Sequence, residues 1–133
     1  MSDDLMQVEL VAADRLVWSG RARSVTARTT EGDVGILPHH APLLAVMVHG
    51  VVDVVTEDGE SWVAAVDSGF LSVANNLISI LSEHARMSHE IDLEKARTDL
   101  ERTRAEGADD TDAEQRLAAA WADAQVRAAE RAP

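Results

Sequence analysis

Two adjacent histidines, His39 and His40, stand in the stretch EGDVGILPHHAPLL at residues 31–44. Imidazole is a common metal ligand and acid–base group, so the pair is a candidate for a metal site. Neighbouring side chains on a strand point to opposite faces, and these rings would converge on one ion only where Pro38 and Pro42 make the backbone irregular. The other three histidines form no motif of the HExxH kind. A metal enzyme is therefore the weakest of the functional hypotheses.

Nucleophilic chemistry has no better support in the sequence. The chain has no cysteine, no GxSxG segment and no GxxxxGK[S/T] phosphate loop. Ser68, in the segment DSG, is typical of a turn between strands. We therefore do not expect this chain to catalyse a reaction by itself.

The stretch at residues 31–44 also has a structural interpretation. Gly32 and Gly35 permit backbone conformations that other residues avoid, and the two prolines stiffen the segment that follows. Glu31 and Asp33 flank the first glycine, where a strand is expected to begin and where acidic side chains face water. These features predict a rigid acidic corner that contacts a partner, with an ordinary structural turn as the alternative.

Length and charge limit the possible classes of protein. The 133 residues suffice for one domain, or for a small domain with an appendage. Twenty-four acidic residues against twelve basic ones give a formal net charge of −12, which repels nucleic acid and anionic lipid. The first residues do not resemble a secretory signal, and the most apolar stretch, LLAVMVHGVVDVV, is too short to cross a membrane. We expect a cytoplasmic protein with no nucleic-acid partner and no direct membrane insertion.

Residues 1–86 have the pattern of short β-strands. β-Branched residues alternate with polar ones, and turn signals recur in the segments WSGRAR, EDGE, DSG and NN. Turns of two to four residues join antiparallel strands, because parallel neighbours need a crossover of about a dozen residues. With no helix between the strands, this segment predicts an antiparallel β-sandwich or a flattened barrel.

The alternating positions of these strands predict the hydrophobic core. Aromatic residues are only 3% of the chain, so aliphatic side chains must fill most of the core. Trp18, Trp62 and Phe70 are expected to pack as well. The predicted core consists of Val8, Leu10, Val25, Ile36, Val46, Val54, Val63, Val66, Leu71, Val73, Ile78 and Ile80.

Residues 87–133 are rich in helix-forming residues and predict two helices in an antiparallel hairpin. Gly107 is expected to cap the end of the first helix, and Thr111 with Glu114 to form a capping box at the start of the second. The apolar seam of the helices is rich in alanine, which contributes little burial at about 25 cal/mol per Å². We therefore expect a weakly docked hairpin. The stripe predicted on the second helix is Leu117, Trp121, Ala124 and Ala128.

Four segments together resemble the epsilon subunits of bacterial F-type ATP synthases. They are DRLVWSG (14–20), EGDVGILPHHAPLL (31–44), DSGFLSVANN (67–76) and IDLEKA (91–96), and they occur in the order typical of that family. The resemblance implies a β-sandwich over residues 1–86 and a regulatory helical hairpin over residues 87–133. It also implies a noncatalytic rotor subunit, peripheral on the cytoplasmic face of the cell membrane, that couples c-ring rotation and hydrogen ion transport to ATP synthesis.

The resemblance also assigns contacts to the stretch examined first. It implies that Glu31 and Asp33 meet the c-ring of the membrane sector. It places the contact with the gamma subunit at His40, Ala41, Pro42 and Leu43. His39 occupies a position that is often glycine in the family, which predicts a different local turn.

In the family, the hairpin extends into the alpha/beta catalytic head and restrains ATP hydrolysis. In some bacterial members, a motif of the form IDxxRA and arginines of the second helix bind ATP as a regulatory ligand; no other cofactor is implied. An ATP-sensing module that uses IDLEKA is therefore the alternative function, although Lys95 replaces the arginine of the motif. The implied ATP-binding residues are Glu83, Ile91, Asp92, Lys95, Ala96, Arg127 and Arg131.

Overall fold

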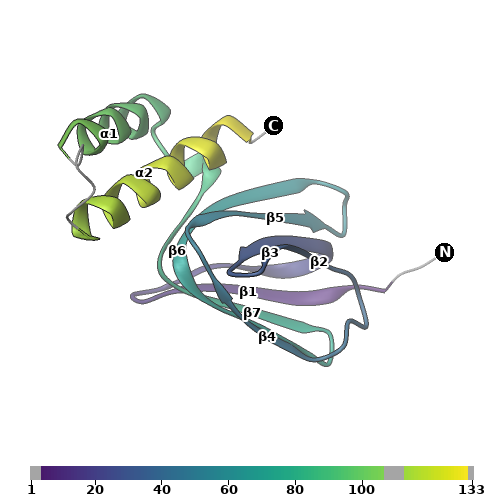
Figure 1. Cartoon of the computed structure of the whole chain (residues 1–133). Coiled ribbons are helices and arrows are strands. Elements are labelled where there is room, and N and C mark those ends of the chain that lie inside the picture. Colours follow the sequence, from purple (N-terminus) through teal and green to yellow (C-terminus); the bar gives the residue numbers. More distant parts are fainter. Residues whose placement is uncertain (1–3, 107–112, 132–133) are drawn as a thin grey trace.

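A computed structural model describes residues 4–106 and 113–131 of the chain. It contains a sandwich of β-strands and a pair of helices on one side of it (Figure 1). The strands are β1 (Met6–Ala12), β2 (Leu16–Thr29), β3 (Gly32–Ile36), β4 (Leu43–Met47), β5 (Gly50–Thr56), β6 (Ser61–Ala74) and β7 (Leu77–Met87). A short 3₁₀-helix, η1 (Ser88–Glu90), leads to helices α1 (Leu93–Glu106) and α2 (Ala113–Arg131).

The strands form a curved sheet that folds back on itself. Its order is β1-β7-β6-β4-β2-β3, while β5 pairs with both β2 and β6 and β1 also pairs with β2. The predicted β-sandwich is confirmed. The prediction that all strands run antiparallel is wrong for one pair, because β1 and β7 run parallel. These two strands are separated by most of the domain, so no short turn dictates their direction.

Two segments predicted as turns lie inside long strands. Strand β2 runs for 14 residues through the segment WSGRAR, and β6 runs for 14 residues through the segment DSG. In β6, Ser68 and Gly69 adopt positive φ angles of 41° and 140°, so the strand is distorted there, yet it continues and keeps its register with β7. The segments EDGE and NN do form turns, with positive φ at Gly59 and at both asparagines. A distortion inside a strand and a turn use the same residue types, so the sequence pattern did not distinguish them.

The hydrophobic core lies between the two layers of the folded sheet. Eleven of the twelve predicted core residues are buried, and Trp18 and Trp62 pack partly buried against them. Val46 and Phe70 were predicted inside but are 49% and 53% exposed. The two residues pair directly across β4 and β6, while their neighbours Met47 and Leu71 point inward. Because side chains alternate along a strand, only one of each neighbouring apolar pair can face the core.

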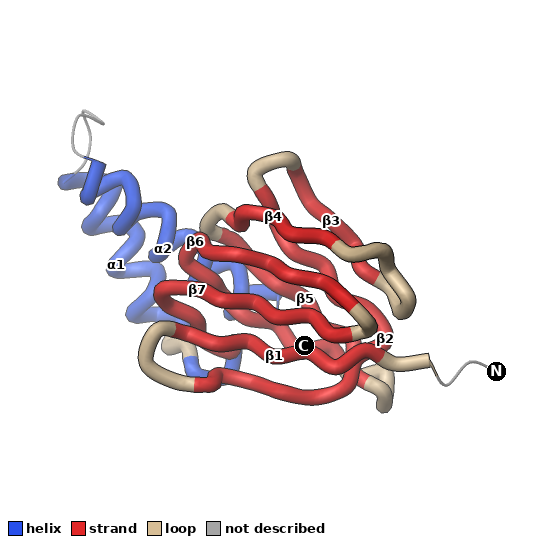
Figure 2. The backbone as a smooth tube through the Cα atoms, turned by 90° about the horizontal axis from the view of Figure 1, so that it is seen from below, coloured by secondary structure: helices blue, strands red, loops and turns tan. Residues whose placement is uncertain are grey.

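The two helices pack on each other, and α2 alone forms the main contact with the strands (Figures 1 and 2). Ala124 and Ala128 of α2 lie against Val63 and Ala65 of β6 in a small apolar cluster. The predicted stripe is wrong at Leu117, which is 56% exposed, because contact with the sheet begins only near Trp121.

Helix α1 packs mainly against α2. Ala96 and Leu100 pack against Ala122 and Val126, which form a second apolar face of α2. Two ion pairs fix the antiparallel direction, Arg97–Glu130 at 2.8 Å and Arg104–Asp123 at 3.8 Å. The predicted caps at Gly107 and Thr111 lie outside the described residues. Neither described helix is long and apolar enough to span a membrane.

Candidate functional site

The acidic corner lies in the turn between β2 and β3. The Thr29 hydroxyl accepts a hydrogen bond from the Glu31 backbone amide at 3.1 Å and donates one to the Gly32 carbonyl at 2.8 Å. Gly32 has a φ of 109°, a conformation that glycine adopts without strain. The side chains of Glu31 and Asp33 are exposed on this ordered turn. The corner is therefore an acidic turn whose backbone is held by the Thr29 side chain.

The two histidines of the β3–β4 loop point to different partners. His39 Nε2 is 3.3 Å from Asp4 Oδ2, and its Nδ1 is 3.2 Å from the Asn76 side-chain amide. His40 Nδ1 lies 2.7 Å from the carbonyl oxygen of Ala41. No group of His, Asp or Glu side chains able to hold a metal ion occurs within residues 4–106 and 113–131. The metal-site hypothesis therefore gains no support from the geometry.

An exposed apolar face follows directly from that loop. Val46 of β4 pairs with Phe70 of β6, which in turn pairs with Leu81 of β7. Leu44, two residues before Val46, is 73% exposed. We use the term outer apolar face for the exposed side chains on these three strands, which are Leu44, Val46, Phe70, Leu77 and Leu81.

The predicted gamma contact at residues 40–43 lies beside this face but does not include its exposed side chains. Leu43 was implied at the interface, yet its side chain packs partly buried against the core. Leu44 is the exposed neighbour. A usable signal existed, because apolar residues occupy both alternating sets of positions in β4 and β6, although only one set can face the core.

The structure separates the implied ATP-binding residues into two groups. Those of the IDLEKA segment lie at the start of α1, next to the end of α2 that carries Arg127 and Arg131. Glu83 is elsewhere, in a hollow between β7, the β1–β2 turn and Trp121 of α2. The seven residues therefore do not converge on one site.

Most of the charged side chains in the first group already have partners within the chain. Arg131 is 2.8 Å from Asp53 on β5, and Arg127 is 2.9 Å from Asp123. The side chain of Asp92 caps α1, since its Oδ1 accepts the Lys95 backbone amide at 3.2 Å. Lys95 itself pairs with Asp99 at 3.1 Å. These carboxylates neutralise the cations that a nucleotide would need.

The pKa of Asp53 is displaced from its ordinary value. It lies under the end of α2, and burial raises the pKa of its carboxyl, while the nearby charge of Arg131 acts in the opposite direction. Next to this pair is a hollow of about 400 Å³. The hollow is lined by Arg28, Asp33, Gly50, Val51, Arg127, Glu130 and Arg131.

The linker η1 is held by its own side chains. Glu90 accepts the Met87 backbone amide at 3.0 Å and pairs with Arg15 at 3.3 Å. The ring of His89 meets the Trp62 indole edge-on, with centroids 5.8 Å apart. These contacts give the linker a defined conformation between β7 and α1.

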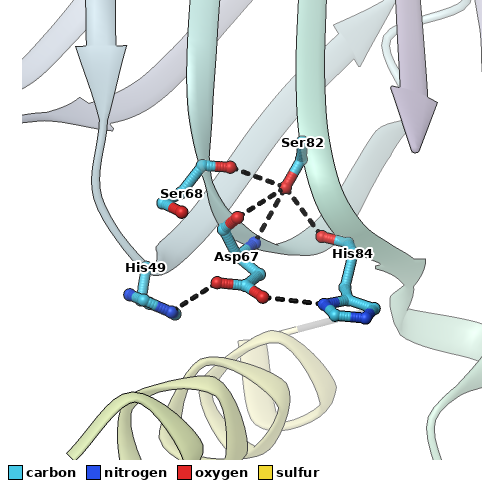
Figure 3. Close-up of polar contacts among 5 residues, drawn as sticks. All are labelled: His49, Asp67, Ser68, Ser82 and His84. Carbon is cyan, nitrogen blue, oxygen red and sulfur yellow. Dashed lines mark hydrogen bonds and ion pairs between the residues drawn. The ribbon is translucent and has the colours of Figure 1, made fainter. Parts of the chain in front are cut away.

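A polar cluster that the sequence did not predict lies where α2 crosses the strands (Figure 3). Asp67 accepts from two histidines: His49 Nε2 is 2.5 Å from one carboxylate oxygen, and His84 Nδ1 is 2.8 Å from the other. Ser82 contacts the backbone of the distorted segment of β6. Its hydroxyl oxygen is 3.0 Å from the Asp67 backbone amide and lies 2.8–2.9 Å from three carbonyl oxygens, those of Asp67, Ser68 and His84.

This cluster contains Ser, His and Asp but is not a catalytic triad. The Ser82 hydroxyl is engaged with the backbone and contacts the carbonyl oxygen of His84, so no imidazole is placed to activate it. The ring of His84 instead faces Trp121 of α2, with centroids 5.9 Å apart. The cluster serves the packing of strand on strand and helix on sheet.

Comparison with known proteins identifies the class to which this architecture belongs. Residues 5–88 match the family described as ATP synthase, Delta/Epsilon chain, beta-sandwich domain. The ATP synthase epsilon chain of Streptomyces avermitilis is 52% identical over 123 residues, covering 92% of this chain and 94% of the relative. That of Rhodococcus opacus is 48% identical over 128 residues, covering 96% and 98%. The chain therefore belongs to the bacterial ATP synthase epsilon chains, which are noncatalytic subunits.

Solved structures show the same fold at low sequence identity. A chain of the Euglena gracilis mitochondrial ATP synthase OSCP/F1/c-ring structure aligns with a TM-score of 0.77 at 24% identity, covering 98% of this chain and 82% of that one. A chain of the Tetrahymena thermophila mitochondrial ATP synthase central stalk/c-ring structure aligns with a TM-score of 0.55 at 16% identity, covering 98% of both.

Proposed function

We propose that this chain is a rotor subunit of the central stalk, coupling c-ring rotation and hydrogen ion transport to ATP synthesis in the catalytic head. The observation that carries the proposal is the outer apolar face, which has no cover within the described chain and lies next to the β3–β4 loop. Grouped large apolar side chains on the surface of a protein are typical of an interface. Because the chain belongs to the ATP synthase epsilon chains, we infer that this interface is used inside an ATP synthase.

The outer apolar face is the surface that we assign to the gamma subunit. It extends the contact implied at His40, Ala41, Pro42 and Leu43 onto the strands that follow. A stalk subunit must transmit torque, and a contact built from packed apolar side chains on a rigid sheet resists sliding better than exposed charges.

The acidic corner is the surface that we assign to the c-ring. Glu31 and Asp33 are exposed on a turn that Thr29 fixes, so their charges have defined positions. Defined charges give orientation and specificity at an interface. With this contact the chain sits at the cytoplasmic face of the cell membrane as a peripheral subunit.

Charge reversal tests the c-ring assignment. We expect Asp33→Lys in the complete synthase to lower proton-driven ATP synthesis relative to ATP hydrolysis, because the corner would then repel a basic partner. Asp58→Lys, in the exposed β5–β6 turn, is the matched control and should leave the ratio unchanged. Equal loss in both variants would refute the assignment.

The helical pair is the element that we assign to regulation. Its contact with the sandwich uses mainly small side chains, which favours a hairpin that leaves its site and extends into the alpha/beta head to restrain ATP hydrolysis. The proposed division lies between residues 1–86 and 87–133. Deleting residues from 88 onward should leave a folded sandwich that assembles and a synthase whose ATP hydrolysis rises. Loss of folding would show that the two parts are not separate.

ATP sensing is the second candidate function. The observation that favours it is the meeting of the IDLEKA segment with Arg127 and Arg131 at one end of the helical pair. Titration calorimetry with ATP and Mg²⁺ on the full chain tests it. Heat that disappears in Arg131→Ala would support a sensor, and no heat at millimolar ATP would remove this candidate.

A further inference from the structure

His84 lies between a carboxylate and a helix. Its Nδ1 is 2.8 Å from Asp67 Oδ2, and its ring is inclined by 33° to the indole of Trp121 on α2, with the ring centroids 5.9 Å apart. Figure 3 shows α2 passing close to the side of the cluster where both histidine rings lie. The side chain of His84 is 61% exposed, so protons exchange with it freely.

We propose that His84 and Trp121 form a proton-sensitive latch, in which protonation of His84 strengthens the docking of α2 on the sandwich. A neutral imidazole packs on the indole, whereas an imidazolium is also attracted by the negative face of the indole ring. Histidine is the side chain that ordinarily changes charge between pH 5 and 8. The latch concerns docking within this chain and does not depend on the proposed place in the rotor.

Asp67 and its partners fix the position of the latch. The carboxylate receives His49 on one side and His84 on the other, and Ser82 fastens the backbone of Asp67. All four residues belong to the sandwich and stay in place when α2 leaves. Asp67 and Ser82 therefore orient the His84 ring whether α2 is docked or not. They do not by themselves make docking depend on the charge of His84.

The other charged groups beside His84 also belong to the sandwich. Asp14 and Arg15 come from the β1–β2 turn, and Glu83 and Arg86 come from β7; together they line the hollow of about 450 Å³ next to the ring. Arg15 pairs with Glu90, and Arg86 donates to the side-chain oxygen of Gln125 on α2 at 3.4 Å. Within the described part of α2, Trp121 is the residue that lines this hollow. The indole is thus the group whose arrival on docking distinguishes the two charge states.

The direction of the effect follows from linkage. Because the cation gains the indole face only in the docked state, protonation favours docking, and docking favours protonation by the same factor. The extra stabilisation is present at the acidic end of the histidine range and is lost as the pH rises. A cation–aromatic contact at an exposed site corresponds to about a two- to fivefold change in the docking equilibrium.

Hydrogen exchange on the full chain tests the latch. Protection factors of α2 amides, corrected for intrinsic exchange rates, are compared at pH 5.5 and pH 8, with β1 amides reporting the stability of the sandwich itself. We expect α2 protection to be about two- to fivefold higher at pH 5.5, with no matching change in β1. His84→Gln should abolish this difference, whereas the control His40→Gln should retain it.

Two variants of the partner separate the latch from simple packing. Trp121→Phe keeps a smaller aromatic face and should leave α2 docked with a reduced pH dependence. Trp121→Leu keeps apolar contact without the π face and should remove the pH dependence. Equal α2 protection at both pH values in the unmodified chain would overturn the proposal, and so would a pH dependence that survives in His84→Gln.

Discussion

His39 places a side chain in a backbone conformation that favours glycine. The sequence predicted an altered turn, because glycine is common at this position in related chains. In the structure, His39 has a φ of 66°, which is the left-handed conformation that glycine adopts easily. Its backbone amide donates to Asn76 Oδ1 at 2.5 Å, and its ring lies beside Asp4. These polar contacts offset part of the strain of placing a side chain in this conformation.

Replacing His39 by glycine should stabilise the chain. The left-handed conformation costs a residue with a β-carbon about 1 kcal/mol or more, and the exposed ring contacts recover only part of that cost. We expect His39→Gly to raise the free energy of unfolding by up to about 1 kcal/mol in urea titrations. The control His40→Gly, at a residue with no positive φ, should stabilise nothing. A loss of stability in His39→Gly would mean that the ring contacts outweigh the backbone strain.

Gly69 is the opposite case, where no other residue fits. A β-carbon there would lie 1.9 Å from the carbonyl oxygen of Leu81, and the φ of 140° is closed to other residues. We expect Gly69→Ala to lower the free energy of unfolding by about 2–4 kcal/mol, because the strand next to Asp67 must rearrange. Gly35→Ala is the control, since nothing lies within 4 Å of the added carbon. It should change stability by less than about 0.5 kcal/mol.

At the scale of elements, the docking of α2 combines a weak apolar seam with polar contacts at two points. Ala124 and Ala128 fill the seam, Arg131 reaches Asp53 near one end, and Trp121 lies on His84 near the other. The sequence predicted that the seam would consist of small side chains. It did not predict which of the two helices would contact the strands, and in the structure this helix is α2. Both helices carry an apolar stripe, with Ala96 and Leu100 in α1 and Ala124 and Ala128 in α2, so the pattern did not decide between them.

The buried carboxyl of Asp53 gives the stability of the fold a pH dependence in the acidic range where carboxyl groups titrate. Because burial raises the pKa of Asp53, the ionised carboxylate is less favourable in the folded chain than in the unfolded one. This effect stabilises the fold below the ordinary titration range of a carboxyl and is lost as the pH rises through the raised pKa of Asp53. We therefore expect Asp53→Asn to raise the free energy of unfolding at pH 7, with the gain disappearing below pH 4.

Urea titrations at several pH values measure this effect. The control Asp58→Asn, in the exposed β5–β6 turn, should show no comparable gain at pH 7. If Asp53→Asn is less stable than the unmodified chain at pH 7, the attraction to Arg131 outweighs the burial of the carboxylate.

For the whole molecule, alternation and turn signals predicted the sandwich, and the change in composition near residue 87 predicted the helices. The predictions failed where the outcome depends on contacts distant in sequence. The parallel pairing of β1 with β7, the continuation of β6 through Gly69 and the outward direction of Phe70 each depend on which strand lies alongside. The cluster around Asp67 was missed for the same reason, because its histidines are 18 and 17 residues away from it along the chain.

The outer apolar face leads to the prediction that bears on the complex as a whole. Phe70 is half exposed near the centre of this face, so Phe70→Asp should cost the isolated chain little stability. At an interface, however, a carboxylate would be buried without a partner, and we expect binding to the gamma subunit to weaken at least tenfold, about 1.4 kcal/mol. Leu117→Asp is the matched control, because Leu117 is equally exposed but lies on α2. Co-purification of each variant with gamma measures the difference, and equal binding by both variants would place the gamma contact on another surface.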